Sequence, residues 1–376
     1  MKTLMLLPLI GQPRHAKRID MLIQEGIEVE VFSFERTSRK GRNPNCKVTM
    51  LGRVEDEKYL SRIPILLAGI VKIRKKIKET DAVYAMSIDL SILAKVSAIG
   101  LNKKIQILEL GDIRLLQTAP GMKGKLFRWF DEWFTRKLDL LVVTSAEYYT
   151  QYYQKWIGID TDYIVIENKL ENSGIKDDRH ASVSQKKKTE SPITIGYFGL
   201  MESKWSWEVL QKLAIMYPEK FNVLLAGVPN FLDDYESICL AHSNINYFGQ
   251  YSSPDQLPEL YSKIDVSWAC SNPSLGNDWT LRWARTNRSY EACLFQKPII
   301  TRAGSSEGIF VESNGLGVTL DEVETDKAVD FLASVDWSQI EQWKLSLRSL
   351  DRSAYIYTDE ASKLAKFIRA KVNIAV

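Results

Sequence analysis

The amino-acid sequence predicts an α/β protein built from two Rossmann-like, doubly wound domains that face a cleft. Short, nearly continuous apolar runs alternate with longer amphipathic stretches, which is the rhythm of parallel strands and their covering helices. This rhythm stops once, in a polar and charged stretch, and then starts again. The chain has 376 residues, which is long for one core and natural for two domains.

The predicted elements follow in order along the chain. In the first half, the runs that predict strands are residues 4–8, 29–34, 82–86, 105–108, 140–144 and 163–166. In the second half, they are residues 193–198, 222–226, 245–248, 266–269, 298–301 and 317–320. Amphipathic stretches between the runs, such as AKRIDMLIQEG and SWEVLQKLAIMYPEK, predict the helices.

Four segments are expected from this pattern. They are a first Rossmann-like domain (1–170), a linker (171–191), a second Rossmann-like domain (192–357) and a C-terminal helix that packs back on the first domain (358–376). Ligands of such sheets bind outside the carboxyl ends of the strands, so polar residues at those ends are the candidates for a site.

Composition excludes several classes of protein. The chain is 45% hydrophobic and 26% charged, and its net charge of +3 is too balanced for a nucleic-acid binder. The cysteines lack metal-ligand and C-x-x-C spacing, so reduced thiols in the cytoplasm are expected. The N-terminal apolar run is brief and predicts a buried strand, and no run is long enough to span a bilayer.

The stretch ITIGYFGLMESKWSWEVLQKLA (193–214) is the first candidate for a binding element. Its strand ends at Gly199, and a helix begins near residue 203 or 205. The backbone N–H groups of a helix start favour an anion, and Lys204 adds a positive charge there. An ordinary turn with a solvated lysine explains the same residues, so both interpretations stay open. The chain has no G-x-G-x-x-G, the fingerprint of nicotinamide-dinucleotide binding.

The stretch TNRSYEACLFQKPIITRAGSSEGIF (286–310) is the second candidate. The polar residues Asn287 and Arg288 precede the predicted helix EACLF, and Arg288 can face phosphate oxygens bidentately. Glu291, in the first turn of that helix, either complements the helix dipole or accepts hydrogen bonds from the paired hydroxyls of a ribose. The loop after the strand KPIIT contains Ser306, Glu307 and Gly308, and its small residues let backbone amides approach a ligand.

These motifs resemble a known family. Glu291-Ala292, followed by Pro298-Ile299-Ile300, resembles the E-A-x-A-x-G-x-P-V-I signature of family-4-type glycosyltransferases with the GT-B fold. The stretches IQILELGDIR, LDLLVVTSAEYYTQYY, NVLLAG and INYFGQYSSPDQLPELYSKIDVSWA resemble further family blocks in the same order. The longer stretches of sequence around these motifs are most similar to bacterial exopolysaccharide and capsular polysaccharide transferases of the succinoglycan type. The resemblance covers essentially the whole chain.

The resemblance implies a cytoplasmic enzyme that moves a sugar from a UDP- or GDP-sugar co-substrate to a lipid-linked or oligosaccharide acceptor. It implies a nucleotide in the C-terminal domain, an acceptor in the N-terminal domain, retention of configuration, and no cofactor or metal. Lys204 and Arg288 would neutralise the leaving diphosphate. Asp112 would contact the acceptor hydroxyl, either as a base or, if the enzyme retains configuration, without the need for a dedicated base. The loop of Gly11 and His15 would approach the diphosphate, although a surface histidine explains His15 equally well.

Several positions depart from the family pattern. Trp283 stands where the first glutamate of E-x7-E is usual, so the sugar-contacting carboxylate is missing or is replaced by Asp278. Gln296 replaces a glycine, a double-glycine loop is reduced to Gly11, and Gly111 stands where a histidine is common. Donor sugar and stereochemistry therefore stay open.

The motif Asp160-Thr161-Asp162 spells D-x-D, the metal signature of another glycosyltransferase fold. It precedes a predicted strand instead of following one, which places it on the wrong edge of the sheet for the cleft. We expect a solvated loop there.

Two basic segments of the first half permit two interpretations. IPILLAGIVKIRKKIKE carries a basic run, and GMKGKLFRWFDEWFTRKLD carries aromatic residues beside lysines and an arginine. They are either covering helices with solvated edges or a surface for anionic lipid on the inner face of the plasma membrane.

Two rival functions remain from the sequence. A nucleotide-sugar epimerase of the two-Rossmann type would bind the same donor without a glycan acceptor. A non-catalytic glycan-assembly subunit is favoured by Trp283 in place of the usual glutamate.

Overall fold

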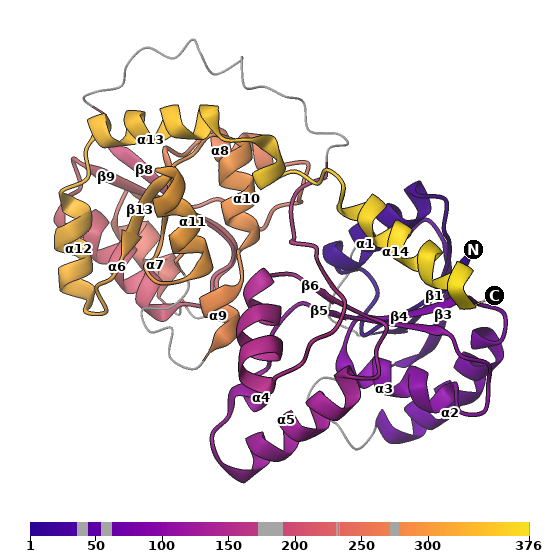
Figure 1. The fold of residues 1–376 in the computed structure, drawn as a ribbon. Helices are drawn as coiled ribbons and strands as arrows, with labels where there is room; N and C mark the ends of the chain where they lie inside the picture. The colour runs from indigo at the N-terminus through magenta and orange to yellow at the C-terminus, as the bar shows by residue number, and fades with distance from the viewer. Residues whose placement is uncertain are drawn as a thin grey trace. The chain divides into compact units, whose positions relative to one another are not determined.

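The structure is a computed structural model that describes residues 1–35, 44–53, 62–171, 191–230, 232, 234–270 and 278–375. The chain divides into two compact units, which are treated separately below (Figure 1). The first unit comprises Met1–Asn168 with Thr358–Val376, and the second comprises Lys169–Tyr357.

The first unit contains a seven-stranded sheet in the order β3-β2-β1-β4-β5-β6-β7. Every pairing in it is parallel. Its strands are β1 (Lys2–Leu7), β2 (Glu28–Glu35), β3 (Lys47–Arg53), β4 (Ala82–Ala85), β5 (Ile105–Leu110), β6 (Leu140–Val143) and β7 (Tyr163–Val165). The strand order reverses between β1 and β4, which is where sheets of this kind hold ligands.

The helices of the first unit lie between the strands. They are α1 (Pro13–Gln24), α2 (Arg62–Ile77), α3 (Ile88–Ser97), α4 (Leu115–Thr118), α5 (Gly121–Thr135), the π-helix η1 (Tyr148–Ile157) and α14 (Glu360–Ala375). Although α14 is last in the sequence, it lies beside α1 and contacts β5 and β7 (Figure 1). An ion pair of 3.1 Å between Lys371 and Asp162 joins α14 to the residue before β7.

The second unit contains a six-stranded parallel sheet in the order β10-β9-β8-β11-β12-β13. Its strands are β8 (Ile193–Leu200), β9 (Phe221–Val228), β10 (Ile245–Tyr247), β11 (Val266–Trp268), β12 (Ile299–Arg302) and β13 (Gly317–Leu320). Its helices are α6 (Lys204–Met216), α7 (Tyr235–Ala241), α8 (Leu257–Ser262), α9 (Trp279–Trp283), α10 (Asn287–Leu294), α11 (Ser306–Asn314), α12 (Thr325–Ala333), α13 (Trp337–Ser349) and the 3₁₀ turn η3 (Arg352–Ala354).

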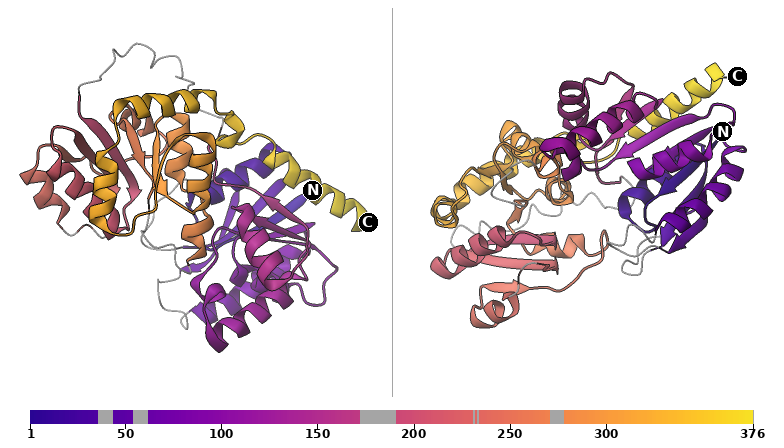
Figure 2. Two further views of the ribbon diagram at one scale, coloured as in Figure 1. Left: turned by 60° about the vertical axis from the view of Figure 1, so that its left-hand side comes forward. Right: turned by 90° about the horizontal axis from the view of Figure 1, so that it is seen from below.

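Helices cover both faces of the second sheet (Figure 2). Along β8, Ile195 and Tyr197 join one hydrophobic cluster and Phe198 joins another, because successive side chains of a strand point to opposite faces. The twelve apolar runs expected to be strands are strands, and central ones such as β4, β5 and β11 are buried along their whole length. The strands β7 and β10, at sheet edges, are partly exposed.

The edge strand β3 is missing from the sequence-based prediction. Its sequence KVTMLGR begins with alternating polar and apolar residues. Among its described side chains, only that of Leu51 exposes less than a tenth of its surface. A search for continuous apolar runs finds central strands and overlooks a half-solvated edge strand such as this one.

The core of the first unit contains a buried ion pair. Arg18 Nε lies 2.7 Å from Glu109 Oε2, and Tyr84 donates a hydrogen bond of 2.5 Å to the same oxygen. Arg18 and Glu109 are both at most 1% exposed, so their attraction is poorly screened. Burial raises the pKa of Glu109, but Arg18, Arg14 and Tyr84 outweigh it and hold that pKa below its ordinary value.

Candidate functional site

The candidate site lies at the carboxyl edge of the second sheet, where the strand order reverses between β8 and β11. A cavity of about 240 Å³ opens there between strand ends and helix starts. Its lining comprises Tyr197, Leu200, Glu202, Ser203, Ala269, Thr280, Leu281, Ala284, Thr286, Arg288, Thr301, Arg302, Ser305 and Glu307. This is the position at which open α/β sheets bind nucleotides, so the cavity is the candidate nucleotide site.

Arg288, in the first turn of α10, is fixed over the end of β8. Its Nε donates to the Phe198 carbonyl at 2.5 Å, and its Nη2 donates to the Leu200 carbonyl at 2.8 Å. Gly199, between these two acceptors, has a φ of +90°, a conformation that side chains other than glycine rarely adopt. The bonds leave the tip of the guanidinium, Nη1 with Nη2, as the edge that can bind an anion.

Three helices begin at this edge of the sheet. Ser203 caps α6 by accepting a hydrogen bond from Ser206 N at 3.1 Å, and Ser305 caps α11 by accepting one from Gly308 N at 2.9 Å. The third helix, α10, begins at Asn287, directly before Arg288. Helix starts carry partial positive charge on their N–H groups, so together with Arg288 they make this edge suited to a phosphate.

Glu307 lines the cavity and holds its walls together. Its carboxylate accepts hydrogen bonds from Thr286 N (3.0 Å), Thr286 Oγ1 (2.8 Å) and Thr301 Oγ1 (3.1 Å). Burial raises the pKa of Glu307, and the threonine bonds only partly oppose that effect. This carboxyl group links the start of α11 to the start of α10 and to β12.

The expectation that Ser306, Glu307 and Gly308 form a loop is wrong, because they are the first turn of α11. A Cβ on Gly308 would lie 2.2 Å from the Arg302 carbonyl oxygen, so this glycine is needed for the close packing of α11 on β12. Ser306 Oγ is buried without a hydrogen-bond partner among the described residues.

Glu291 lies deeper than its predicted position. Because α10 begins at Asn287, Glu291 is in the second turn, where a role for the helix dipole alone is weak. Its side chain is 6% exposed, and Tyr261 donates a hydrogen bond of 3.0 Å to Oε2. It is not among the residues that line the cavity. Burial and then the charge of Glu291 raise the pKa of Tyr251, whereas the charge of Arg288 lowers it.

The structure does not bring Lys204, Asp278 and Asn287 into the cavity lining. Lys204 begins α6 next to Ser203, but its side chain is 79% exposed and pairs with Glu208 at 3.9 Å. Asp278 caps α9 by accepting hydrogen bonds from Thr280 N (3.0 Å) and Leu281 N (3.1 Å). Asn287 is an exposed residue at the start of α10.

Trp283, which stands at the usual position of a glutamate, ends α9 and packs against Trp279 with 6.4 Å between ring centroids. Apolar packing thus occupies the place where the family pattern has a carboxylate.

The candidates in the first unit lie at its own switch point. Gly11, with a φ of +89°, follows β1, and His15 lies in the first turn of α1. His15 is 1% exposed, so the alternative of a surface histidine is wrong. Its Nδ1 donates to the Leu9 carbonyl at 3.0 Å, and its Nε2 has no hydrogen-bond partner among the described residues. Burial, followed by the charge of Arg14, lowers the pKa of His15 to about 4, so it is neutral at neutral pH.

Asp112 is an exposed residue that follows β5. The residue before it, Gly111, lies against the Arg14 side chain: a Cβ added there would be 1.5 Å from Arg14 Nη1. The loops after β1 and β5 are therefore in contact within the first unit. Asp160 and Asp162 precede β7, at the opposite edge of this sheet, as the sequence predicts.

Sequence reasoning did not single out Tyr197, Thr286, Thr301, Arg302 and Ser305. Arg302 is the last residue of β12, and its guanidinium donates to carbonyls of the loop that follows β13, namely those of Asp321 (2.8 Å) and Glu322 (3.2 Å). Arg302 directly follows the apolar run PIIT, and this position was visible in the sequence. Since ligands bind outside the carboxyl ends of the strands, its position makes Arg302 a candidate as well.

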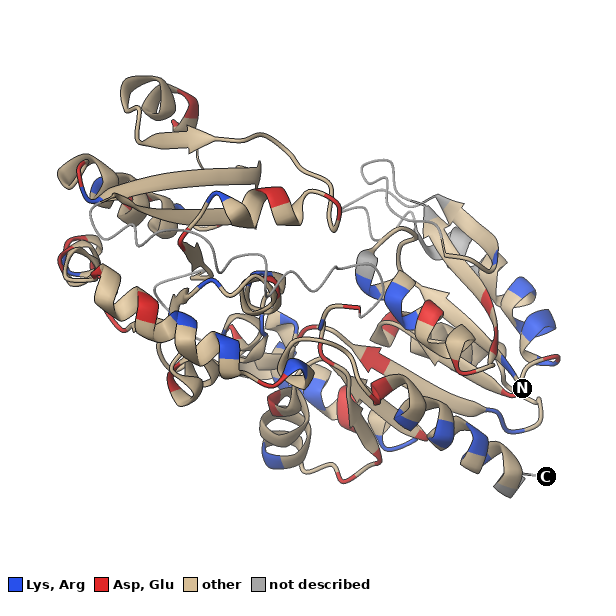
Figure 3. Cartoon of the chain, turned by 90° about the horizontal axis from the view of Figure 1, so that it is seen from above, with Lys and Arg blue, Asp and Glu red and all other residues tan. Residues whose placement is uncertain are grey.

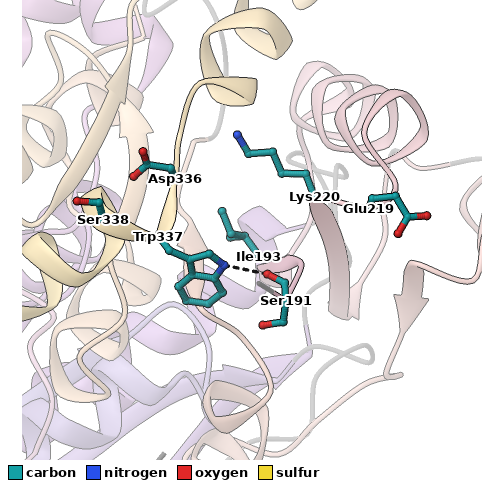
Figure 4. Close-up of a pocket in the computed structure, with 7 residues that line it drawn as sticks. All are labelled: Ser191, Ile193, Glu219, Lys220, Asp336, Trp337 and Ser338. Atoms are coloured by element: carbon teal, nitrogen blue, oxygen red, sulfur yellow. Dashed lines mark hydrogen bonds between the residues drawn. The ribbon is translucent and has the colours of Figure 1, made fainter. Parts of the chain in front are cut away.

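A second cavity, of about 370 Å³, lies at the opposite edge of the second sheet (Figure 4). Its walls come from the residues that precede β8, β9 and α13, and Trp337 Nε1 donates to the Ser191 carbonyl at 2.8 Å across it. Lys220 donates to the Ala333 carbonyl at 2.6 Å. This cavity is at the amino ends of the strands, so it is not a candidate for the nucleotide.

Charges are interspersed over both units. Lys and Arg occur together with Asp and Glu in both units, although α2 carries basic residues only, and the net charge of the sequence is +3 (Figure 3). Among the described residues, no helix has the length and hydropathy needed to cross a bilayer.

Comparisons with known proteins give similarity over most of the chain. The chain is 22% identical over 335 residues to the succinoglycan biosynthesis protein ExoL of Rhizobium meliloti, and the match covers 86% of this chain and 82% of that protein. No family model matches the chain.

Among solved structures, the chain is similar to sucrose-phosphate synthase from Thermosynechococcus elongatus (TM-score 0.71, 13% identity, 100% of both chains). It is also similar to HepE from Anabaena in complex with UDP and glucose (TM-score 0.66, 13% identity, 98% of this chain and 100% of that chain). A third is WaaG, a glycosyltransferase involved in lipopolysaccharide biosynthesis (TM-score 0.64, 12% identity, 97% of this chain and 99% of that chain). With its two parallel sheets and this similarity, the chain has the GT-B fold, as the sequence predicts.

Proposed function

We propose that this chain is a glycosyltransferase that moves a sugar from a nucleotide-sugar donor to a glycan acceptor during assembly of an exopolysaccharide. The observation that carries the proposal is the cavity at the switch point of the second sheet, beside an anchored arginine and three helix starts. The GT-B fold and the similarity to a succinoglycan biosynthesis protein support the same reaction class.

The cavity suits the diphosphate of a UDP- or GDP-sugar. The tip of Arg288 and the N–H groups at the starts of α10 and α11 supply positive charge at one place. Negative charge grows on the diphosphate as the bond to the sugar breaks, and fixed donors of this kind lower the barrier to that step. Glu291, behind α10, would hold the ribose hydroxyls, and Lys204 would approach from the start of α6.

The acceptor, proposed to be a lipid-linked glycan, would bind the first unit. Asp112 is exposed after β5 and would accept a hydrogen bond from the acceptor hydroxyl. His15 is neutral, and its Nε2 is an acceptor without a partner among the described residues, so it suits a hydroxyl group. We also propose that the protein acts in the cytoplasm, at the inner face of the membrane that holds such an acceptor.

The finer features of the reaction are proposals as well. A family-4-like enzyme would retain the configuration of the sugar and would need no divalent metal, since Arg288 and the helix starts stabilise the leaving group. Activity that disappears in chelator and returns with Mg²⁺ or Mn²⁺ would contradict the metal-independent step.

A panel of thermal melts tests the donor class. A ligand at about one hundred times its Kd stabilises the native state by about 2.7 kcal/mol, which is a shift of a few degrees in Tm for a chain of this size. We expect one nucleoside diphosphate and its sugar conjugates to raise Tm, and the matching nucleoside to do so far less. No shift with any UDP- or GDP-sugar would overturn the proposed donor site. A bound donor that is epimerised instead of transferred would support the rival epimerase.

A further inference from the structure

The outer face of α5 carries an apolar stripe that no other described element of the first unit covers. Met122, Leu126, Trp129 and Trp133 are 86%, 67%, 62% and 48% exposed. We refer to these four residues as the α5 stripe. Exposed apolar groups of this size that gather in one place mark an interaction surface more often than chance solvent contact.

Helical geometry places these side chains on one face. Their spacing of four, three and four residues confines them to an arc of roughly 60°, since each residue of a helix turns about 100°. The buried residues of α5 lie on the other side. Among them, Asp131 accepts hydrogen bonds of 2.9 Å from both Gln117 and Tyr152. The helix is therefore anchored with the α5 stripe turned outward.

Cations flank the stripe on both sides. Lys123 and Lys125 are exposed near the start of α5, and Arg136 and Lys137 are exposed just beyond its end. Lys137 Nζ lies 3.3 Å from the centroid of the Trp133 ring. Glu132, paired with Arg136 at 2.9 Å, offsets only one of these charges. Apolar and aromatic residues between lysines and arginines form the pattern of a helix that lies in the headgroup region of an anionic bilayer.

In the basic run of α2, the other candidate from the sequence, Arg74 and Lys76 form contacts inside the protein, whereas Lys72, Lys75 and, just beyond the helix, Lys78 are exposed. Arg74 donates to the carbonyls of Ser97 (3.1 Å) and Ile99 (2.5 Å). Lys76 forms ion pairs with Glu30 at 2.5 Å and with Glu79 at 3.0 Å. The first of these partners is buried, so this lysine stabilises the first unit and is not free to bind lipid.

We propose that the α5 stripe and its flanking lysines and arginines dock the first unit on an anionic phospholipid surface. The tryptophan rings would lie at the level of the headgroups, which is the depth that tryptophan prefers, and the cations would contact the lipid phosphates. This inference rests on the proposed peripheral location and assigns it to one surface, but it does not depend on sugar transfer.

Vesicle sedimentation with the full chain tests the proposal. We expect binding to vesicles of phosphatidylcholine with phosphatidylglycerol, and much weaker binding to phosphatidylcholine alone. Trp129→Ala with Trp133→Ala should lower the partition coefficient at least tenfold. Lys123→Glu with Lys125→Glu should lower it about twentyfold or more, because each cation near the surface contributes roughly a factor of five.

Matched controls separate this surface from the rest of the molecule. Lys72→Glu with Lys75→Glu changes the same charge on exposed residues of α2, and Leu240→Ala removes an 89% exposed leucine from α7 of the second unit. Both should keep much more of the parent's binding than the two α5 variants do, since neither control removes a residue of the α5 stripe or one of its flanking cations. Nucleotide affinity, measured on the same variants, should not change, so the test does not depend on the proposed donor site.

Three outcomes would overturn the proposal. One is equal binding of the lysine variant and the parent, and another is an equal loss in the α2 control. The third is self-association of the parent that Trp129→Lys abolishes while vesicle binding is kept, which would assign the stripe to a second copy of the chain. The lysine variant decides the question if the tryptophan variant fails to fold.

Discussion

Replacing Arg288 by methionine should separate its role in the fold from its role in binding a nucleotide. In the protein without ligand, the guanidinium donates to two carbonyls at the end of β8, at 2.5 and 2.8 Å. Hydrogen bonds from a charged donor contribute about 1.5–3 kcal/mol each when they are buried. Part of the Arg288 side chain is solvated, so we expect a total loss of about 1–3 kcal/mol in the free energy of unfolding.

The loss in ligand binding should be larger than a surface charge can explain. A charge-assisted contact with the diphosphate is worth about 1.5–3 kcal/mol, so the Kd for UDP or GDP should rise roughly 10- to 150-fold. Arg288→Lys keeps the charge but not the fork that reaches two carbonyls, and it should fall in between. Lys212→Met is the matched control, because Lys212 lies two turns along α6 and pairs with Asp326 outside the cavity.

Isothermal titration with UDP and with GDP measures these constants, and urea unfolding measures the stabilities. The reasoning is refuted if Arg288→Met binds the nucleotide as tightly as Lys212→Met does. An equal loss of nucleotide affinity in both variants would show that binding depends only on the overall positive charge of the second unit and not on the position of Arg288.

Three further predictions follow from single contacts. The pKa of His15 falls from 6.5 to about 4 on folding, so the unfolded chain binds more protons than the folded chain between these two pH values. The free energy of unfolding should therefore drop by about 2 kcal/mol from pH 7 to pH 5. His15→Asn should flatten that drop in urea titrations, and an unchanged slope would assign it elsewhere. Arg18→Met and Glu109→Gln should each lower the free energy of unfolding by about 3–5 kcal/mol, because each leaves a buried partner unpaired. The double variant with both substitutions should lose clearly less than the sum of the two single losses, and strict additivity would contradict the buried pair. Glu291→Gln keeps an acceptor for the Tyr261 hydroxyl, so it should barely change Tm. It should weaken nucleotide binding roughly tenfold to hundredfold, because a charge-assisted hydrogen bond to the ribose is lost. A Kd within about twofold of the parent would remove Glu291 from the site.

The fold was predictable because its central strands, such as β4, β5 and β11, are buried on both faces. Buried parallel strands give continuous apolar runs in the sequence. The run of β13 (Gly317–Leu320) also has the expected bounds, although only its last residue is buried. The strand β3 lacked that signal, since one of its faces is solvated and its residues alternate. The start of α10 was misplaced by four residues because the polar residues Asn287 and Arg288 look like a loop until their N-terminal position in the helix is known.

The site was predictable only in part, for a geometric reason. Ligands of open α/β sheets bind outside the carboxyl ends of the strands, and this rule pointed to Arg288 and Glu307, both of which line the cavity. It cannot say which way a side chain turns, and so it grouped the exposed Lys204 with them. Threonines such as Thr286 and Thr301 carry no signal of their own, and only the buried carboxyl group between them reveals their place.

We propose above that the second unit holds a nucleotide-sugar donor for transfer to a glycan. The most direct test incubates the purified chain with isotope-labelled UDP- or GDP-sugars and membranes that contain lipid-linked glycan precursors. We expect label in the lipid fraction with one donor, inhibition by the matching nucleoside diphosphate, and a large loss with Arg288→Met but not with Lys212→Met. Label that never leaves the nucleotide, or transfer that Arg288→Met leaves intact, would contradict it.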